Sequence, residues 1–82
     1  MARLIEVFIA GCPLCNTAVS MLRDLIPEDV ELRVYNIAAD EKAYEKALHY
    51  GVSAVPAIVI DGRLVYQGVP GRNILEKALK NS

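Results

Sequence analysis

The stretch that decides the fold covers residues 4–15 and reads Leu4-Ile5-Glu6-Val7-Phe8-Ile9-Ala10-Gly11-Cys12-Pro13-Leu14-Cys15. Its first half is almost entirely apolar and rich in β-formers, as expected for a strand that is covered on both faces. Gly11 breaks this strand, and Pro13 suits the first position of a helix, where a missing N–H costs nothing. We therefore predict a buried strand that leads into a helix, with two cysteines at the junction.

The segment after the cysteines has the pattern of an amphipathic helix. Its apolar residues recur at the spacing of one helical face, at Cys15, Ala18, Val19, Leu22, Leu25 and Ile26. Pro27 follows and cannot continue this helix. We therefore expect Cys15 to lie on the side of the helix that faces the core.

A second strand and a second helix come next. Residues 30–35 alternate apolar and polar side chains, as in a strand with one better-buried face. Asp40 is a suitable N-cap for a helix that runs through Tyr50, and Gly51 is suited to end it. We expect the inward residues of this helix to be Tyr44, Ala47 and Leu48.

A hairpin and a last helix complete the chain. Asp61-Gly62, between apolar residues 57–60 and 64–66, is among the strongest short signals for a hairpin. A final amphipathic helix carries its apolar residues at Ile74, Leu75, Ala78 and Leu79. The predicted order is β-α-β-α-β-β-α in one domain, residues 1–82. The first two strands join by a right-handed parallel crossover, so we expect an α/β fold with a four-stranded mixed sheet and helices on both faces.

Charge and hydrophobicity exclude several classes of protein. Nine Lys and Arg residues are balanced by ten Asp and Glu residues, without a run of either sign. The chain therefore lacks the basic footprint of proteins that bind nucleic acid or an anionic membrane. No stretch approaches the roughly 20 apolar residues of a membrane span. We expect a monomer in the cytoplasm.

Cys12 and Cys15 predict redox chemistry, because two thiols separated by two residues at a strand-to-helix junction can form and break a disulfide. Cys12 is expected to be the nucleophile, since unpaired N–H groups and the dipole at a helix start favour a thiolate. Cys15, in the apolar stripe, is expected to be more buried and to resolve the mixed disulfide. The disulfide between Cys12 and Cys15 is then the only redox group required, with no other cofactor.

Metal binding is the alternative that the cysteines leave open. A closed structural zinc site needs four ligands, and besides the two cysteines the chain offers one histidine, His49. A metal could then be held only between two chains or with an external thiol, as in a thiol-based metal-binding or metal-transfer module. We predict no metal site within the chain.

Two motifs together resemble the thioredoxin superfamily, namely Cys12-Pro13-Leu14-Cys15 after the first strand and Ser53-Ala54-Val55-Pro56 before the hairpin. The nearest match is to small, glutaredoxin-sized prokaryotic thioredoxins, over essentially the whole chain. The resemblance implies a minimal thioredoxin fold in which Pro56 follows a cis peptide bond beside the cysteines. It also implies that the backbone of Val55 binds an extended segment of a partner protein. Pro13 and Pro56 are thus supporting residues, and the chain is expected to reduce disulfides in partner proteins.

Departures from the glutaredoxin pattern bear on the electron donor. Leu14 stands where glutaredoxins usually carry Tyr, and residues 68–73 lack their Gly-Gly pair and nearby Asp, although Arg72 could still meet a carboxylate. We therefore favour a donor of the thioredoxin-reductase type, with a glutathione-dependent glutaredoxin as the alternative. The partner-binding surface is expected to be an apolar rim that suits a protein, formed by Leu14, Ala54, Val55, Val69 and Pro70.

Glu6 interrupts the strand that should be the most buried, six positions before Cys12. The resemblance implies a role, because larger thioredoxins carry at this offset a buried Asp that exchanges protons with the resolving cysteine. A buried carboxylate beside a thiol could act as a general base. The other interpretation is that Glu6 faces solvent or pairs with a lysine.

Overall fold

The computed structural model describes residues 3–11 and 13–80, which form four strands and three helices. Along the chain these are β1 (Leu4–Ile9), α1 (Pro13–Leu25), β2 (Glu31–Asn36), α2 (Glu41–His49), β3 (Ala57–Ile60), β4 (Arg63–Gln67) and α3 (Arg72–Lys80). This is the order that the sequence predicted. Pro13 begins α1, as predicted, and Pro56 directly precedes β3.

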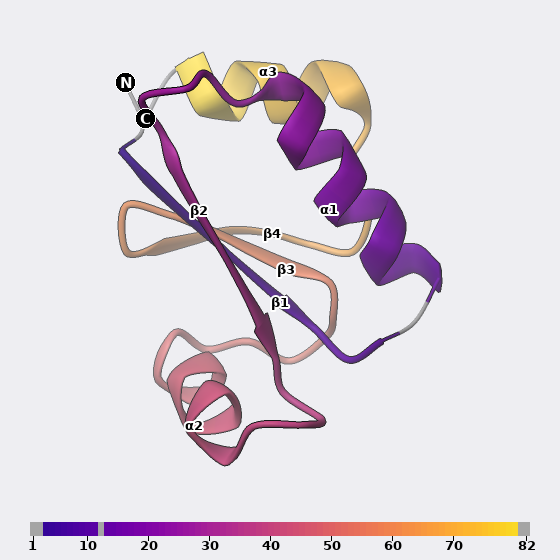
Figure 1. Ribbon diagram of the computed structural model, residues 1–82, viewed down its shortest axis with the longest axis vertical. Coiled ribbons are helices and arrows are strands. Elements are labelled where there is room, and N and C mark those ends of the chain that lie inside the picture. The colour runs from indigo at the N-terminus through magenta and orange to yellow at the C-terminus, as the bar shows by residue number, and fades with distance from the viewer. Residues whose placement is uncertain (1–2, 12, 81–82) are drawn as a thin grey trace.

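The strands form one mixed sheet in the order β2-β1-β3-β4. β1 runs parallel to β2 and antiparallel to β3, and β4 is antiparallel to β3. Figure 1 shows α1 and α3 on one face of the sheet and α2 on the other. The predicted α/β fold, with a four-stranded mixed sheet and helices on both faces, is thus confirmed.

The core forms two layers, because successive residues of a strand point to opposite faces of the sheet. Facing α1 and α3, the buried residues are Ile5, Val7, Leu22, Val30, Ile58, Ile60 and Leu75. Facing α2, they are Phe8, Ala47, Ala57 and Val59. The two central strands, β1 and β3, contribute to both layers, which explains why their sequences are almost continuously apolar.

Residues at the ends of helices and strands adopt the capping and turn conformations that the sequence predicted. Asp40 caps α2, and its Oδ1 accepts a hydrogen bond from the N–H of Lys42 at 3.0 Å. Gly51 follows the helix with a φ of 82°, a conformation that favours glycine. In the turn between β3 and β4, Asp61 and Gly62 have φ values of 48° and 84°, as the tightest hairpin turns require.

The inward face of α2 differs from the prediction. Tyr44 and Leu48 are 49% and 56% exposed, whereas Ala43 and Ala47 are buried. Small side chains let this helix lie close to the sheet, and the longer side chain of Lys46 reaches a buried carboxylate from the same side. The prediction is confirmed for Ala47 and wrong for Tyr44 and Leu48, because this helix meets the sheet through its alanines and the long side chain of Lys46.

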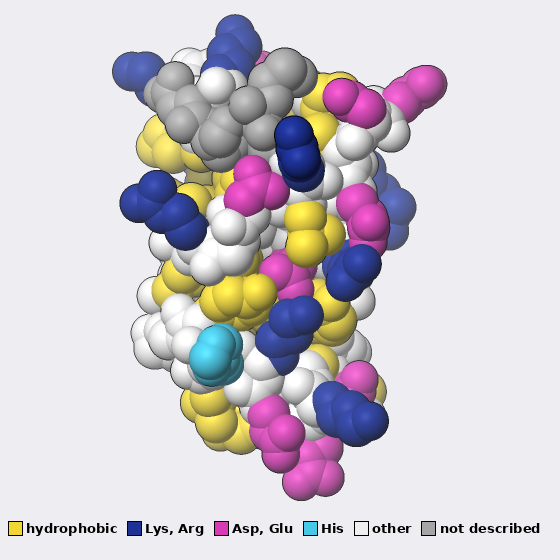
Figure 2. Space-filling view, turned by 90° about the vertical axis from the view of Figure 1, so that its left-hand side faces the viewer, with side chains coloured by type: hydrophobic (Ala, Val, Ile, Leu, Met, Phe, Trp, Pro, Cys, Tyr) yellow, Lys and Arg dark blue, Asp and Glu magenta, His cyan; other side chains and the backbone are white. Residues whose placement is uncertain are grey.

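The outer surface carries both signs of charge. On the face shown in Figure 2, Lys and Arg side chains lie among Asp and Glu side chains, with apolar atoms between them. Val34 on the outer strand β2 and Ile74 on α3 are 38% and 53% exposed. No helix in the part of the chain that the structure describes is long and apolar enough to cross a bilayer.

Candidate active site

Cys15 lies in the first turn of α1 and is completely buried. The chain leaves β1 through Gly11, whose φ of 78° favours glycine, and enters α1 at Pro13. The N–H of Ala10 donates a hydrogen bond to the Cys15 sulfur, at 3.5 Å. Burial and this hydrogen bond fix the position of the sulfur at the start of the helix.

Cys12 lies outside the described residues, so its expected exposure and its role as nucleophile stay predictions. In the sequence it directly precedes Pro13, the first residue of α1. Pro13 and Leu14 are both exposed, Leu14 to 60%. The described neighbourhood of the pair is therefore open to solvent at Pro13 and Leu14 and closed at Cys15.

The peptide bond between Val55 and Pro56 is cis, which confirms what the resemblance implied. Pro56 is buried directly before β3, and its carbonyl accepts a hydrogen bond from the N–H of Gly68 at 2.6 Å. Val55 is half-buried and Ala54 is exposed. The loop before Pro56 is therefore accessible at Val55, to whose backbone the resemblance assigns partner binding, and at Ala54, a residue of the expected apolar rim.

A glutamine side chain holds this loop from the neighbouring strand. Oε1 of Gln67, the last residue of β4, accepts hydrogen bonds from the N–H of Ser53 at 2.7 Å and from the N–H of Ala54 at 2.9 Å. It also accepts a hydrogen bond from the Ser53 hydroxyl at 3.1 Å. Together with the bond between Gly68 and Pro56, these contacts join the loop before β3 to the loop after β4.

The predicted apolar rim is present in part. Leu14 and Ala54 are exposed and Val55 and Val69 are half-buried, whereas Pro70 is buried and offers no side-chain surface to a partner. Beside Val55 lies a hollow of about 230 Å³, lined by Ile37, Tyr44, Ala47, Leu48, Val52, Ser53, Ala54 and Val55. Its walls carry no charged side chain, so it suits an apolar side chain better than a charged group.

Glu6 is buried against α2, with 1% of its surface exposed. The Tyr50 hydroxyl donates a hydrogen bond to its Oε1 at 2.8 Å, and the Lys46 ammonium lies 2.9 Å from its Oε2. The hydrogen bond with Glu6 is the main cause that raises the pKa of Lys46, because it favours the charged ammonium. The same carboxylate, with burial, raises the pKa of Tyr50 by holding the phenolic proton. Burial and pairing with a lysine are thus both found, and a proton-carrying role for Glu6 stays a prediction.

Sequence reasoning did not single out Lys46 or Gln67, and it gave Tyr50 no role beyond packing. Lys46 and Tyr50 are four residues apart and so share one side of the α2 segment. This spacing, opposite an acid in a buried strand, could have identified them as partners of Glu6. Gln67 leaves no such signal, because its bonds to Ser53 and Ala54 span 14 and 13 residues.

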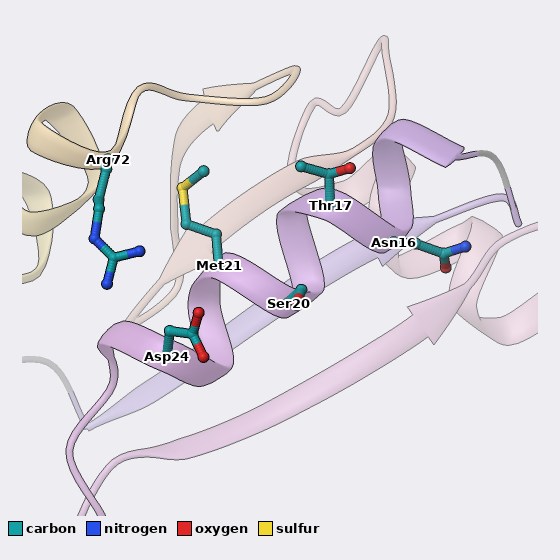
Figure 3. A pocket seen from close by; sticks show the side chains of 6 residues that line it. All are labelled: Asn16, Thr17, Ser20, Met21, Asp24 and Arg72. Carbon is teal, nitrogen blue, oxygen red and sulfur yellow. The ribbon is translucent and has the colours of Figure 1, made fainter.

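A second hollow, of about 480 Å³, lies on the outside of α1. Figure 3 shows the Arg72 side chain extending toward Met21 and Asp24 in the second half of α1, while Asn16 and Thr17 line the opposite end. The Arg72 Nε also lies 3.7 Å from Glu76 Oε1. Arg72 is therefore directed toward the second half of α1 and not toward the helix start at Pro13.

Metal ligands do not gather in the described part of the chain. Within residues 3–11 and 13–80, no group of three His, Cys, Asp or Glu side chains is placed to hold an ion. His49 ends α2, and its ring meets that of Tyr50 in a T-shaped contact with a centroid distance of 6.0 Å. Cys12 is not among these residues, so a metal site that uses its thiol stays an alternative.

Comparison with known proteins adds to this geometry. A family model described as a thioredoxin domain matches residues 3–80. The chain is 34% identical over 80 residues to a thioredoxin of Methanocaldococcus jannaschii, covering 93% of this chain and 91% of that one. It is 36% identical over 81 residues to a probable thioredoxin of Methanothermobacter marburgensis, covering 94% and 92%.

Solved structures show the same likeness. The oxidised form of mitochondrial thioredoxin 3 from Saccharomyces cerevisiae is 27% identical, with a TM-score of 0.75, and the match covers 96% of this chain and 77% of that one. A dimeric thioredoxin-like protein of Nitrosomonas europea is 27% identical, with a TM-score of 0.69, over 93% of this chain and 98% of that one. The chain therefore belongs to the thioredoxin domain family and is of the thiol oxidoreductase kind.

Proposed function

We propose that this chain reduces disulfides in partner proteins through the dithiol of Cys12 and Cys15. The observation that carries the proposal is the position of Cys15. It is buried in the first turn of α1, accepts a hydrogen bond from the Ala10 N–H, and follows Cys12 by three residues. A buried, oriented thiol three residues after a second cysteine suits a two-step exchange in which one sulfur attacks and the other resolves.

The exchange balances with no other redox group. The Cys12 thiolate attacks one sulfur of the partner's disulfide, forms a mixed disulfide and releases the second sulfur, which takes up a proton. Cys15, once deprotonated, attacks the sulfur of Cys12, and the partner leaves with its second thiol. Two electrons and two protons pass to the partner, and the chain is left with the disulfide between Cys12 and Cys15.

The surface around Val55 supports a protein as the substrate. Ala54 is exposed, Val55 is half-buried and the adjoining hollow has no charged wall. An extended segment of the partner would bond to the backbone of Val55 by strand addition and place an apolar side chain in this hollow. Leu14, exposed beside the cysteines in the sequence, would add apolar contact.

We further propose a reductase of the thioredoxin-reductase type as the electron donor, in the cytoplasm, where thiols are kept reduced. The support is the sequence of residues 68–73, which lacks the glutaredoxin Gly-Gly pair, and the direction of Arg72 along α1. A carboxylate of glutathione needs donors aimed at it, and charge-assisted hydrogen bonds contribute roughly 1.5–3 kcal/mol each.

A pair of assays tests the proposal. Reduction of insulin disulfides with NADPH and a thioredoxin reductase should turn over, and reduction of a glutathione mixed disulfide with NADPH and glutathione reductase should be slow. Efficient turnover of the glutathione substrate alone would make the chain a glutaredoxin. No turnover in either assay, with one zinc ion bound per chain or per two chains in the purified protein, would favour the metal-binding alternative.

A further inference from the structure

We propose that Gln67 is a positioning residue, which fixes the shape of the loop on which the partner docks. The inference rests on the proposed function, because it concerns how the partner protein is held. One oxygen atom, Oε1 of Gln67, accepts three hydrogen bonds, two from Ser53 and one from Ala54, at 2.7 to 3.1 Å. The next residue of that loop is Val55, whose backbone we propose to bind an extended segment of the partner.

The chemistry of the donors fixes the orientation of the Gln67 amide. The backbone groups of Ser53 and Ala54 that face it are N–H donors, so only the carbonyl oxygen of Gln67, and not its NH₂, can meet them. To bind these N–H groups, the side chain at position 67 must carry an acceptor, but it need not carry a charge. Methionine would keep the length of the side chain and remove the acceptor, whereas glutamate would keep the acceptor.

The other backbone bonds of the loop lie at its ends. At the start, the N–H of Val52 donates to the carbonyl of Ala47 at 2.9 Å. At the end, the carbonyl of Pro56 accepts from Gly68 at 2.6 Å. Between these points, Gln67 supplies the acceptor that the structure shows for the N–H groups of Ser53 and Ala54.

The consequence concerns binding and not the sulfur chemistry. Without the Gln67 acceptor, Ser53 and Ala54 bond to water and the loop samples other shapes, so a partner must order the loop when it binds. Cys15 lies in the first turn of α1 and its donor Ala10 directly follows β1, so both lie outside these contacts. Removal of the acceptor should therefore weaken the binding of a protein disulfide and leave the attack on a small disulfide unchanged.

The test compares Gln67→Met with Gln67→Glu on two substrates, insulin and the small disulfide 5,5′-dithiobis(2-nitrobenzoate). We expect Gln67→Met to raise KM for insulin by about tenfold, the effect of one or two lost hydrogen bonds, with kcat within about twofold. Its rate with the small disulfide should stay within about twofold of the wild type. Gln67→Glu should behave like the wild type on both substrates, and only Gln67→Met should speed hydrogen exchange at the Ser53 and Ala54 amides.

Four outcomes would count against the inference or its basis. An unchanged KM in Gln67→Met, even with faster amide exchange, would overturn the assignment of Gln67 to docking. An equal loss on both substrates, or a loss in Gln67→Glu as large as in Gln67→Met, would also overturn it. Wild-type protein that reduces the small disulfide but not insulin would instead overturn the proposed function.

Discussion

At Asp61, one carboxylate joins the hairpin turn to the start of the first strand. Its Oδ1 accepts hydrogen bonds from the N–H groups of Arg3 at 3.0 Å and Leu4 at 2.9 Å, and its own N–H donates to the carbonyl of Leu4 at 2.9 Å. The bonds from Leu4 and then Arg3 favour the ionised carboxylate and lower the pKa of Asp61. A group whose pKa is lowered by folding stabilises the folded state above its unfolded pKa and loses that effect as the pH falls.

Asp61→Asn should therefore change the acid side of the stability profile. Asparagine keeps an acceptor oxygen and tolerates the positive φ of 48° at this position, but it does not titrate between pH 5 and 3. We expect the urea midpoint of the wild type to fall more steeply between these pH values than that of Asp61→Asn. Midpoints at pH 5, 4 and 3 check this, and parallel profiles for the two proteins would contradict it.

Burial of Cys15 sets a second expectation at the residue scale. Because its side chain is fully buried, a thiol reagent can reach it only when α1 opens, whereas the helix start at Pro13 and Leu14 is exposed. Limited alkylation of the reduced protein with iodoacetamide should thus label Cys12 first. Peptide mapping by mass spectrometry at less than one label per chain measures the ratio, and dominant labelling of Cys15 would reverse the two assignments.

Residues that act on near neighbours could be predicted, and residues that act across the fold could not. Asp40, Gly62 and Pro13 follow from local rules for caps, turns and helix starts. The cis bond before Pro56 followed from the family resemblance. Gln67 acts through bonds that exist only once β4 lies beside the loop before β3, so no local pattern in the sequence marks it.

At the scale of elements, Glu6 on the central strand β1 connects the sheet to α2 through polar contacts. The Lys46 ammonium reaches Glu6 from a partly exposed position, and it also donates to the Tyr35 hydroxyl at 3.4 Å and lies 5.0 Å from the centre of that ring. The Tyr50 hydroxyl completes the set from the end of the helix. α2 leads into the loop that carries Val55, so this cluster contributes to the placement of the proposed docking surface.

Lys46→Met should destabilise the protein because it leaves the buried Glu6 carboxylate without its cation. We expect a loss of about 1–3 kcal/mol in the free energy of unfolding, since an uncompensated buried charge is costly and Lys46 is partly exposed. The double variant Glu6→Gln with Lys46→Met should recover part of this loss, because glutamine is neutral and still accepts from Tyr50. Urea unfolding of the single and double variants gives the coupling energy. Equal stabilities of Lys46→Met and wild type would contradict this account.

The position of α2 was predictable, but its rotation did not follow from hydrophobic periodicity. Asp40 and Gly51 marked its ends in the sequence. Whether Tyr44 and Leu48 or the alanines face the sheet depends on which residues lie opposite the helix. A buried acid on β1 draws Lys46 and Tyr50 inward, and Tyr44 and Leu48 are then left at the rim of the hollow beside Val55. Hydrophobic periodicity alone contains no information about that acid.

At the scale of the whole molecule, the order of elements and the sheet were predictable from periodicity, turn signals and the handedness of the first crossover. The central strands β1 and β3 can be recognised in the sequence by their continuous apolar residues, because both of their faces are covered. The cysteine spacing and the segment before Pro56 indicated where the site would form. The links between loops that shape this site depend on tertiary contacts, and the structure was needed to find them.

The most direct test of the account is to trap the mixed disulfide on which it depends. Cys15→Ser and Cys12→Ser, each reduced and mixed with a protein that contains one accessible disulfide, are compared by non-reducing electrophoresis and intact mass. We predict that Cys15→Ser accumulates a covalent adduct through Cys12 that dithiothreitol releases, because no second thiol remains to resolve it. Cys12→Ser should form little adduct, since its remaining thiol is buried. The central claim would be contradicted if the adduct formed faster in Cys12→Ser than in Cys15→Ser, or if neither variant formed an adduct.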